Sequence, residues 1–138
     1  MAAVPLDLQA ATTASYTVVE VGGEVDVATA PQLRACLHQA IDAGSRRLVV
    51  DLRQASFIDS EGLGVLVGAR RRLLAHAGHD GSVQLVCAEG LVLRVLRLTG
   101  LDGIFALHAT LSDALGGETG QADDRPGHGD GHWDSAPA

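Results

Sequence analysis

The stretch at residues 48–74, LVVDLRQASFIDSEGLGVLVGARRRLL, constrains the fold more than any other part of the sequence. Residues 48–52 form an apolar run interrupted only by Asp51, which predicts a strand buried on both faces of a sheet. After a short loop, apolar residues recur at helical spacing and predict an amphipathic helix. The expected buried side of this helix consists of Leu63, Leu66, Val67, Leu73 and Leu74.

The segment before this stretch predicts another strand and another helix. The run YTVVEV at residues 16–21 is rich in β-branched residues, which favours a strand, and Gly22 and Gly23 are expected to end it. A helix is expected to begin at Thr29, because Thr29 and Gln32 have the spacing of a capping box. A strand followed by a helix is thus predicted twice.

The same alternation continues beyond residue 74, which predicts one α/β domain over residues 15–115. Its sheet is expected to be mostly parallel, with four to five strands, and to pack with about four helices. The later strands and helices are predicted at residues 82–87, 91–99, 105–107 and 111–115.

Both ends of the chain differ from this domain in composition. Residues 1–14 are rich in Ala and Thr, and the piece at residues 4–8 could add a short edge strand. Residues 116–138 are dominated by Gly, Asp, His and Pro, which predicts a disordered tail because such a segment buries little apolar surface. His128, Asp130 and His132 could bind a metal weakly, but a solvated tail is the favoured interpretation.

Composition excludes several functions. The net charge of −7 argues against a protein that binds nucleic acid through a broad basic surface. The ten basic residues are all Arg, so the Lys of a phosphate-binding P-loop and the amine of a Schiff-base enzyme are missing. No segment approaches the roughly 20 apolar residues of a membrane span, and the amino end does not resemble a signal peptide. We therefore expect a cytoplasmic protein without direct membrane insertion.

Cys36 and Cys87 are far apart in the sequence and do not form a CxxC or zinc-binding pattern. Two reduced, largely buried thiols are the favoured interpretation, and a redox-linked pair is the alternative.

The joint between the central strand and its helix contains Asp59, Ser60 and Glu61. A helix start exposes unpaired N–H groups and a positive partial charge, so it favours carboxylates and phosphates. Ser60 could cap the helix through its Oγ atom, or it could be a phosphorylation site. Residues 58–62 do not match the Gly-x-Ser-x-Gly pattern of a nucleophile elbow, and we do not expect an enzyme.

Two features of the predicted helix each leave an alternative open. Gly64 and Gly68 share a face, which favours close packing of the helix on its own sheet, with a groove for a partner as the alternative. Arg70, Arg71 and Arg72 are expected to form a solvated helix end, and an anion site is the alternative.

The sequence resembles a STAS domain of the anti-sigma factor antagonist family. The resemblance covers about residues 15–115 and rests on GEVD at residues 23–26, the strand at residues 48–52 and above all FIDSEGLGVL at residues 57–66. It implies a small bacterial regulatory domain that binds an anti-sigma factor, a GHKL-type serine kinase, and thereby displaces a sigma factor. Phosphorylation by that kinase would inactivate the domain. ATP would belong to the kinase, so no cofactor is expected in this chain.

The resemblance also implies positions for the site. Asp26 and Asp59 would flank the phosphorylation region, which contains Ser60 and Glu61. The turn at residues 62–64 would shape the docking surface for the partner. The implied partner-binding residues are Asp26, Asp59, Ser60, Glu61, Gly62, Leu63 and Gly64.

One residue departs from the family pattern. The family usually has Asp-Ser-Ser/Thr-Gly here and is phosphorylated on the second hydroxyl, whereas this chain has Glu61 at that position. Glu61 could be a permanent partial mimic of phosphoserine, Ser60 could have taken over as acceptor, or the domain could be an unswitched scaffold. A STAS subunit of a membrane transporter system and a small-ligand-binding STAS module are the alternative functions, and the oligomeric state is not predicted.

Overall fold

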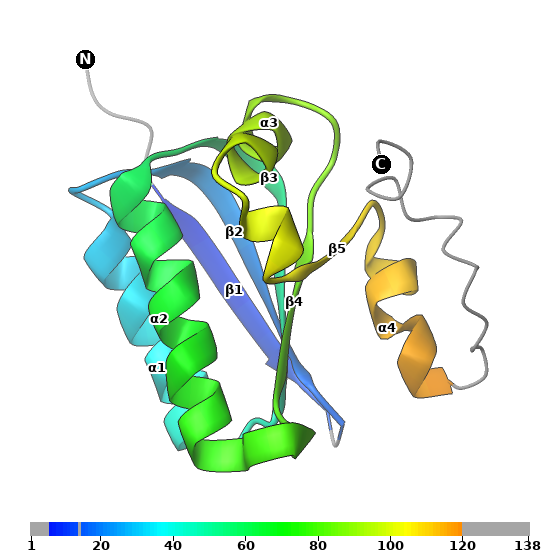
Figure 1. Cartoon of the computed structure of the whole chain (residues 1–138). Helices are drawn as coiled ribbons and strands as arrows, with labels where there is room; N and C mark the ends of the chain where they lie inside the picture. Colours follow the sequence, from blue (N-terminus) through cyan, green and yellow to red (C-terminus); the bar gives the residue numbers. More distant parts are fainter. Residues whose placement is uncertain (1–5, 14, 120–138) are drawn as a thin grey trace.

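The computed structural model describes residues 6–13 and 15–119, with the side chains of 117–119 left out. In this part of the chain, one sheet of five strands is combined with four α-helices (Figure 1). The elements are β1 (Asp7–Thr12), β2 (Thr17–Val25), α1 (Ala30–Asp42), β3 (Arg47–Ile58), α2 (Ser60–Ala77), β4 (Ser82–Val86), α3 (Leu91–Leu98), β5 (Ala106–His108) and α4 (Leu111–Thr119), with short 3-10 turns at Gly78–Asp80 and Leu101–Gly103.

The strands lie in the order β1-β2-β3-β4-β5. Strand β1 pairs with β2 in the antiparallel direction, and the other neighbouring pairs are parallel. The predicted mostly parallel α/β fold is therefore confirmed. Parallel pairing brings the carboxyl ends of β2 and β3 to the same end of the sheet, where Val25 is opposite Ile58.

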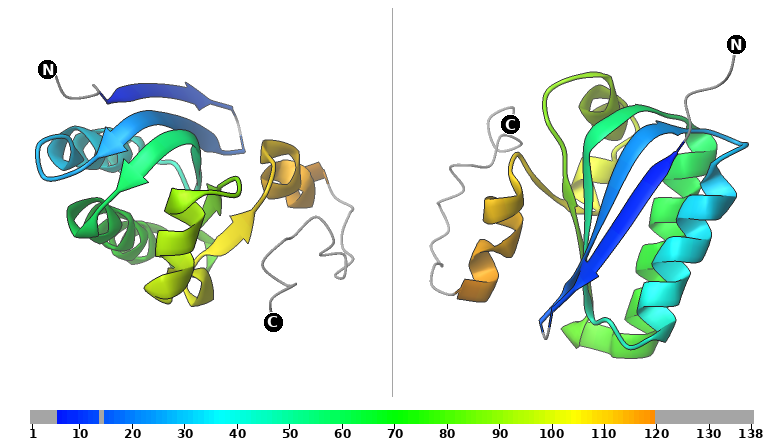
Figure 2. Two further views of the ribbon diagram at one scale, coloured as in Figure 1. Left: turned by 90° about the horizontal axis from the view of Figure 1, so that it is seen from above. Right: turned by 180° about the vertical axis from the view of Figure 1, so that it is seen from behind.

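Helices cover both faces of the sheet. Helices α1 and α2 lie side by side on one face, and α4 lies on the other (Figure 2). Along β3, Leu48, Val50 and Leu52 belong to the main core beneath α1 and α2, whereas Val49 joins a smaller cluster with Ala114 of α4. This arrangement explains why consecutive residues of the central strand are apolar.

Strands β2 and β3 are longer than predicted. Strand β2 continues through Gly22 and Gly23 to Val25, so the prediction that these glycines end the strand is wrong. Its register against β3 shifts between Glu20 and Gly22 and again between Gly23 and Glu24, and Gly23 has a φ of 93°. Glycine at this irregularity accommodates a backbone conformation that other residues rarely adopt, so pairing resumes up to the strand end.

The ends of the domain also differ from the prediction. The edge strand covers Asp7–Thr12, and residues 4 and 5 of the predicted piece lie outside the described residues. Helix α4 continues to Thr119, so the prediction that the tail begins at Gly116 is wrong by four residues. The rest of the predicted tail, with its His and Asp residues, lies outside the described residues.

The glycines of α2 do not have the predicted arrangement. A Cβ added at Gly64 or Gly68 would have no neighbouring atom within 4 Å, so the interpretation that these glycines pack closely on the sheet is wrong. The close approach is at Gly62, where a Cβ would lie 2.6 Å from both Val25 Cγ1 and Ile58 Cγ1. The buried side of α2 is formed by Gly62, Val65, Leu66, Ala69 and Leu73, and of the predicted set Leu63, Val67 and Leu74 are only half-buried.

An ion pair joins the two long helices. Arg72 of α2 donates from Nε and Nη2 to the two carboxylate oxygens of Asp42 in α1, at 3.0 and 2.9 Å. This hydrogen bonding lowers the pKa of Asp42. Arg72 is therefore a partner of α1 rather than a purely solvated residue at the helix end.

We predict opposite effects of alanine at two glycines of α2. Gly62→Ala should lower the free energy of unfolding by about 1–3 kcal/mol, because the added methyl group overlaps Val25 and Ile58. Gly64→Ala should raise it by up to about 1 kcal/mol, because space is open there and Ala favours a helix. Urea denaturation measures both variants, and equal effects would contradict the packing described at Gly62.

We also predict that the two thiols react at different rates. Both cysteines are free, as predicted; Cys36 is half-buried and Cys87 is buried. Burial raises the pKa of Cys36, and burial, with smaller contributions from Asp51 and Glu89, raises the pKa of Cys87 to about 11. Since the thiolate is the nucleophile, iodoacetamide at about pH 8 should label Cys36 first. Peptide mass spectrometry checks the order, with denatured protein as the control in which the two rates converge.

Candidate functional site

The candidate site begins where β3 ends. The backbone N–H of Asp59 donates to Val25 O at 3.1 Å, which ties the end of β3 to the end of β2. Asp59 Oδ1 accepts hydrogen bonds from the backbone N–H groups of Glu61 at 2.9 Å and Gly62 at 3.3 Å. Asp59 is therefore the N-cap of α2, and the alternative in which Ser60 caps this helix is wrong.

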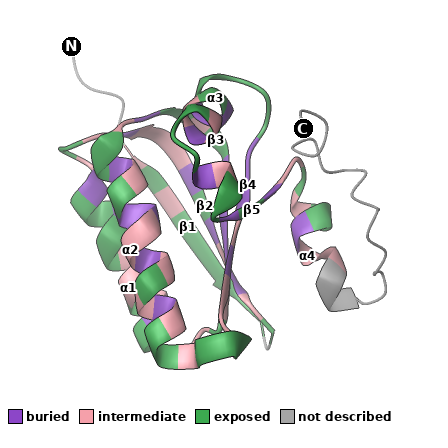
Figure 3. Ribbon diagram, in the orientation of Figure 1, coloured by how far each residue is buried: buried purple, intermediate pink, exposed green. Residues whose placement is uncertain are grey.

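Ser60 and Glu61 form the first exposed residues of α2, and Figure 3 shows the start of this helix as exposed. Within the described residues, the hydroxyl of Ser60 takes part in no hydrogen bond, and Glu61 makes no ion pair. Because Asp59 already satisfies two N–H groups of the first turn, the hydroxyl of Ser60 is available to a partner. The carboxylate of Glu61 lies at the positive end of the helix, which favours its charge.

Asp26 occupies the equivalent position at the end of β2. Its Oδ1 accepts hydrogen bonds from the backbone N–H groups of Ala28 at 2.9 Å and Thr29 at 3.1 Å. The hydroxyl of Thr29 donates to Glu24 O at 2.8 Å and accepts from the N–H of Asp26 at 2.9 Å, so it does not cap α1 and the predicted capping box is wrong. These bonds fix the loop that carries Asp26 beside the end of β3.

Residues 62–64 lie near the start of α2 and differ in their exposure to solvent. Gly62 is buried against Val25 and Ile58, Leu63 is half-buried and Gly64 is exposed. Only Leu63 and Gly64 can therefore contact a partner directly. Gly62 instead determines how closely α2 approaches the strand ends.

Three exposed apolar side chains at this end of the sheet were not singled out as site residues from the sequence. Val27 follows β2 and is 69% exposed, Phe57 lies near the end of β3 and is 36% exposed, and Leu91 begins α3 and is 50% exposed. Large apolar side chains that are exposed at one end of a domain are candidates for contacts with another protein. Sequence patterns could not identify them, because an apolar residue in a loop or strand is equally consistent with burial.

The described residues lack two other kinds of feature. Residues 6–13 and 15–119 contain no group of three or more His, Cys, Asp or Glu side chains placed to hold a metal ion. In the same residues, no helix is both long and apolar enough to cross a membrane. At the joint between β3 and α2, the exposed side chains of Ser60 and Glu61 supply a hydroxyl and a carboxylate.

Comparison with known proteins identifies the family. The STAS domain model matches residues 7–114. The anti-sigma-F factor antagonist RsfB of Mycobacterium tuberculosis is 32% identical over 108 residues, which cover 78% of this chain and 85% of that protein. The anti-sigma-B factor antagonist of Staphylococcus aureus is 32% identical over 96 residues, which cover 70% of this chain and 86% of that protein.

Solved structures show the same fold. An anti-sigma factor antagonist from Mycobacterium paratuberculosis has a TM-score of 0.73 and 31% identity, covering 80% of this chain and 92% of that one. The anti-sigma factor antagonist SpoIIAA in its unphosphorylated form, from Bacillus, has a TM-score of 0.70 and 27% identity, covering 85% of this chain and 100% of that one. The chain belongs to the STAS domain family.

We predict that the cap depends on Asp59 and not on Ser60. Asp59→Ala should lower the free energy of unfolding by about 1 kcal/mol, because two N–H groups lose their acceptor. Asp59→Asn should stay close to wild type because Asn caps equally well. Ser60→Ala should change the free energy of unfolding by less than about 0.5 kcal/mol. Thermal and urea unfolding measure these effects, and a larger loss in Ser60→Ala would contradict the assignment.

Proposed function

We propose that this protein is a cytoplasmic anti-sigma factor antagonist that binds an anti-sigma factor of the GHKL serine-kinase type and thereby releases a sigma factor. It acts by binding and not by catalysis. The main support is the surface at the start of α2, where Ser60 and Glu61 are exposed and Asp59 is engaged in capping. Relatives of similar length that are 32% identical are named anti-sigma factor antagonists, which favours the same role here.

The docking surface extends beyond the first turn of α2. It includes Asp26 on the neighbouring strand end and Leu63 and Gly64 on the helix. Val27 and Phe57 add exposed apolar area at the same end of the sheet. An apolar surface bordered by carboxylates suits a protein partner, because apolar contacts stabilise the complex and charges orient it.

Glu61 gives this surface a permanent negative charge at the usual phosphoacceptor position. Phosphoserine carries a charge of about −1.5 to −2 and three acceptor oxygens, whereas a glutamate supplies about −1 and two. Glu61 at the usual acceptor position therefore acts as a partial, permanent phosphoserine mimic. Binding to the kinase partner is constitutively weakened as a result.

Two other hypotheses about phosphorylation at this site make different predictions. If Ser60 is the acceptor, its phosphate lies between Asp59 and Glu61 and meets like-charge repulsion from both carboxylates. If the domain is an unswitched scaffold, neither residue is phosphorylated. A role in a transporter system or in small-ligand binding belongs to this last case, because the kinase is then not the partner.

We predict that Glu61→Ser strengthens binding to the partner kinase. Isothermal titration calorimetry with anti-sigma factor kinases of the source organism should show about tenfold tighter binding, equivalent to about 1.4 kcal/mol. Asp113→Ser is the matched control, because it removes the same charge from the first turn of α4 on the opposite face. Unchanged affinity in Glu61→Ser would rule out the mimic.

A phosphorylation assay distinguishes the three hypotheses about Ser60 and Glu61. With ATP and the kinase, peptide mass spectrometry should find phosphate at position 61 of the Glu61→Ser variant and none on the wild-type chain. Phosphate on wild-type Ser60, abolished by Ser60→Ala, would instead identify a relocated switch. No binding and no phosphate on either chain would contradict the proposed partner.

A further inference from the structure

A groove lies along helix α3, and its volume is about 330 Å³. The residues that line it come from this helix and the two positions before it, and they are Glu89, Gly90, Leu93, Arg94, Arg97 and Leu98. Leu93 is buried in the core, whereas Leu98 is 78% exposed, the largest fraction among the large apolar side chains of the described residues. The groove therefore presents apolar surface to which a further side chain can bind.

Helix α3 also gives this groove positive charge. The helix contains Arg94 and Arg97 and no acidic residue, and Glu89 is the one carboxylate among the lining residues. Arg94 is exposed, and within residues 6–13 and 15–119 it makes no ion pair. Guanidinium groups stack on aromatic rings and pair with carboxylates. The groove therefore suits an aromatic side chain that has a carboxylate next to it.

The C-terminal segment at residues 120–138 contains such a pair of side chains. It lies outside the described residues, and its sequence includes Trp133, the one tryptophan of the chain, followed directly by Asp134. Four Asp and one Arg give this segment a net charge of −3 with His neutral. This charge is opposite to that of α3, which favours association. A contact through one aromatic side chain is compatible with the low apolar content of the rest of the segment.

The segment is long enough to reach α3. Strand β5 ends at His108, and α4 begins three residues later at the same end of the sheet. The nine residues of α4 carry the chain only about 14 Å away from that end. From Thr119 to Trp133 the chain can extend about 46–50 Å. Helices α3 and α4 lie on opposite faces of the sheet, but β5 is its edge strand, so the segment has only to pass around this edge (Figure 2).

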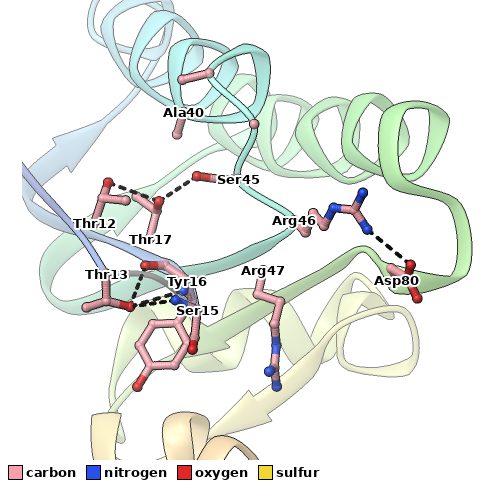
Figure 4. Close-up of a pocket in the computed structure, with 12 residues that line it drawn as sticks. Thr12, Thr13, Ser15, Tyr16, Thr17, Ala40, Ser45, Arg46, Arg47 and Asp80 are labelled. Carbon is pink, nitrogen blue, oxygen red and sulfur yellow. Dashed lines mark hydrogen bonds and ion pairs between the residues drawn. The ribbon is translucent and has the colours of Figure 1, made fainter.

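A larger cavity, of about 720 Å³, lies at the opposite end of the sheet (Figure 4). The hydroxyl groups of Thr12, Thr17 and Ser45 bond to one another on one side of it, whereas Tyr16 and Arg47 extend to the other side. Covering hydroxyl and charged groups with an indole ring would cost their hydrogen bonds with water. The groove on α3 is therefore the better match for Trp133.

We propose that Trp133 docks in the groove of α3 within the same chain. Its indole ring packs on Leu93 and Leu98, and Asp134 pairs with Arg94. Because the segment is tethered, its effective concentration at the groove is on the order of millimolar, so contacts that are weak between separate molecules are sufficient. Docking of Trp133 is independent of any kinase partner.

Fluorescence of the full chain tests this docking, because Trp133 is its only tryptophan. The reference is a synthetic peptide of residues 120–138 in the same buffer. The full chain should emit at shorter wavelength, and acrylamide should quench it at least about twofold less, since the ring is shielded from solvent. Dilution by about tenfold should change neither value, because the contact is intramolecular. Emission and quenching equal to those of the peptide, or a loss of shielding on dilution, would overturn the proposal.

Two substitutions in the groove should release Trp133. Leu98→Ser removes exposed apolar surface and Arg94→Gln removes a charge, and both should raise the quenching constant toward that of the peptide. The replaced side chains are exposed, so the fold should tolerate both changes, which circular dichroism checks. Ile104→Ser and Arg71→Gln are the matched controls outside the groove, and they should leave the quenching constant unchanged. A shielded Trp133 in Leu98→Ser, or an equal loss of shielding in Ile104→Ser, would contradict docking at this groove.

Discussion

The close approach of α2 to the ends of β2 and β3 positions the rest of the candidate site. It depends on the absence of a side chain at Gly62, which lets the helix backbone lie against Val25 and Ile58. Asp59 then caps the helix and, through its own N–H, bonds to Val25 O. Ser60 and Glu61 lie between Asp59, which bonds to Val25 O, and Gly62, which packs against the strand ends, and their own side chains remain exposed. Packing and hydrogen bonds therefore hold the start of α2 against the strand ends.

The two ends of the sheet have different chemistry. At the carboxyl ends of the strands, carboxylates and exposed apolar side chains form an open surface around the start of α2. At the opposite end, hydroxyl groups and arginines line a cavity. Strand β3 connects the two, and its buried residues form the centre of the core.

Much of the fold follows from periodicity and from the continuous apolar strand at residues 48–52. The order of strands and helices and the mostly parallel sheet are as predicted, since they depend on local patterns. The loop predicted at the joint is reduced to Asp59, because β3 continues to Ile58 and α2 begins at Ser60. The errors at Gly22, Gly23, Gly64 and Gly68 share one cause. In the sequence, a glycine shows only that a side chain is absent. Whether it ends a strand, permits an irregularity or faces solvent depends on the segments that pack around it in the folded chain.

The amino-acid sequence alone was enough to predict most of the elements and the position of Asp59, Ser60 and Glu61 at a helix start. Packing in three dimensions was needed to establish which residue caps the helix, which glycine makes the close contact, and which apolar side chains remain exposed at the strand ends. The meeting of Thr12, Thr17 and Ser45 in one cavity also appears only in the folded chain. These outcomes depend on distances between segments remote in the chain, and local sequence patterns carry no information about such distances.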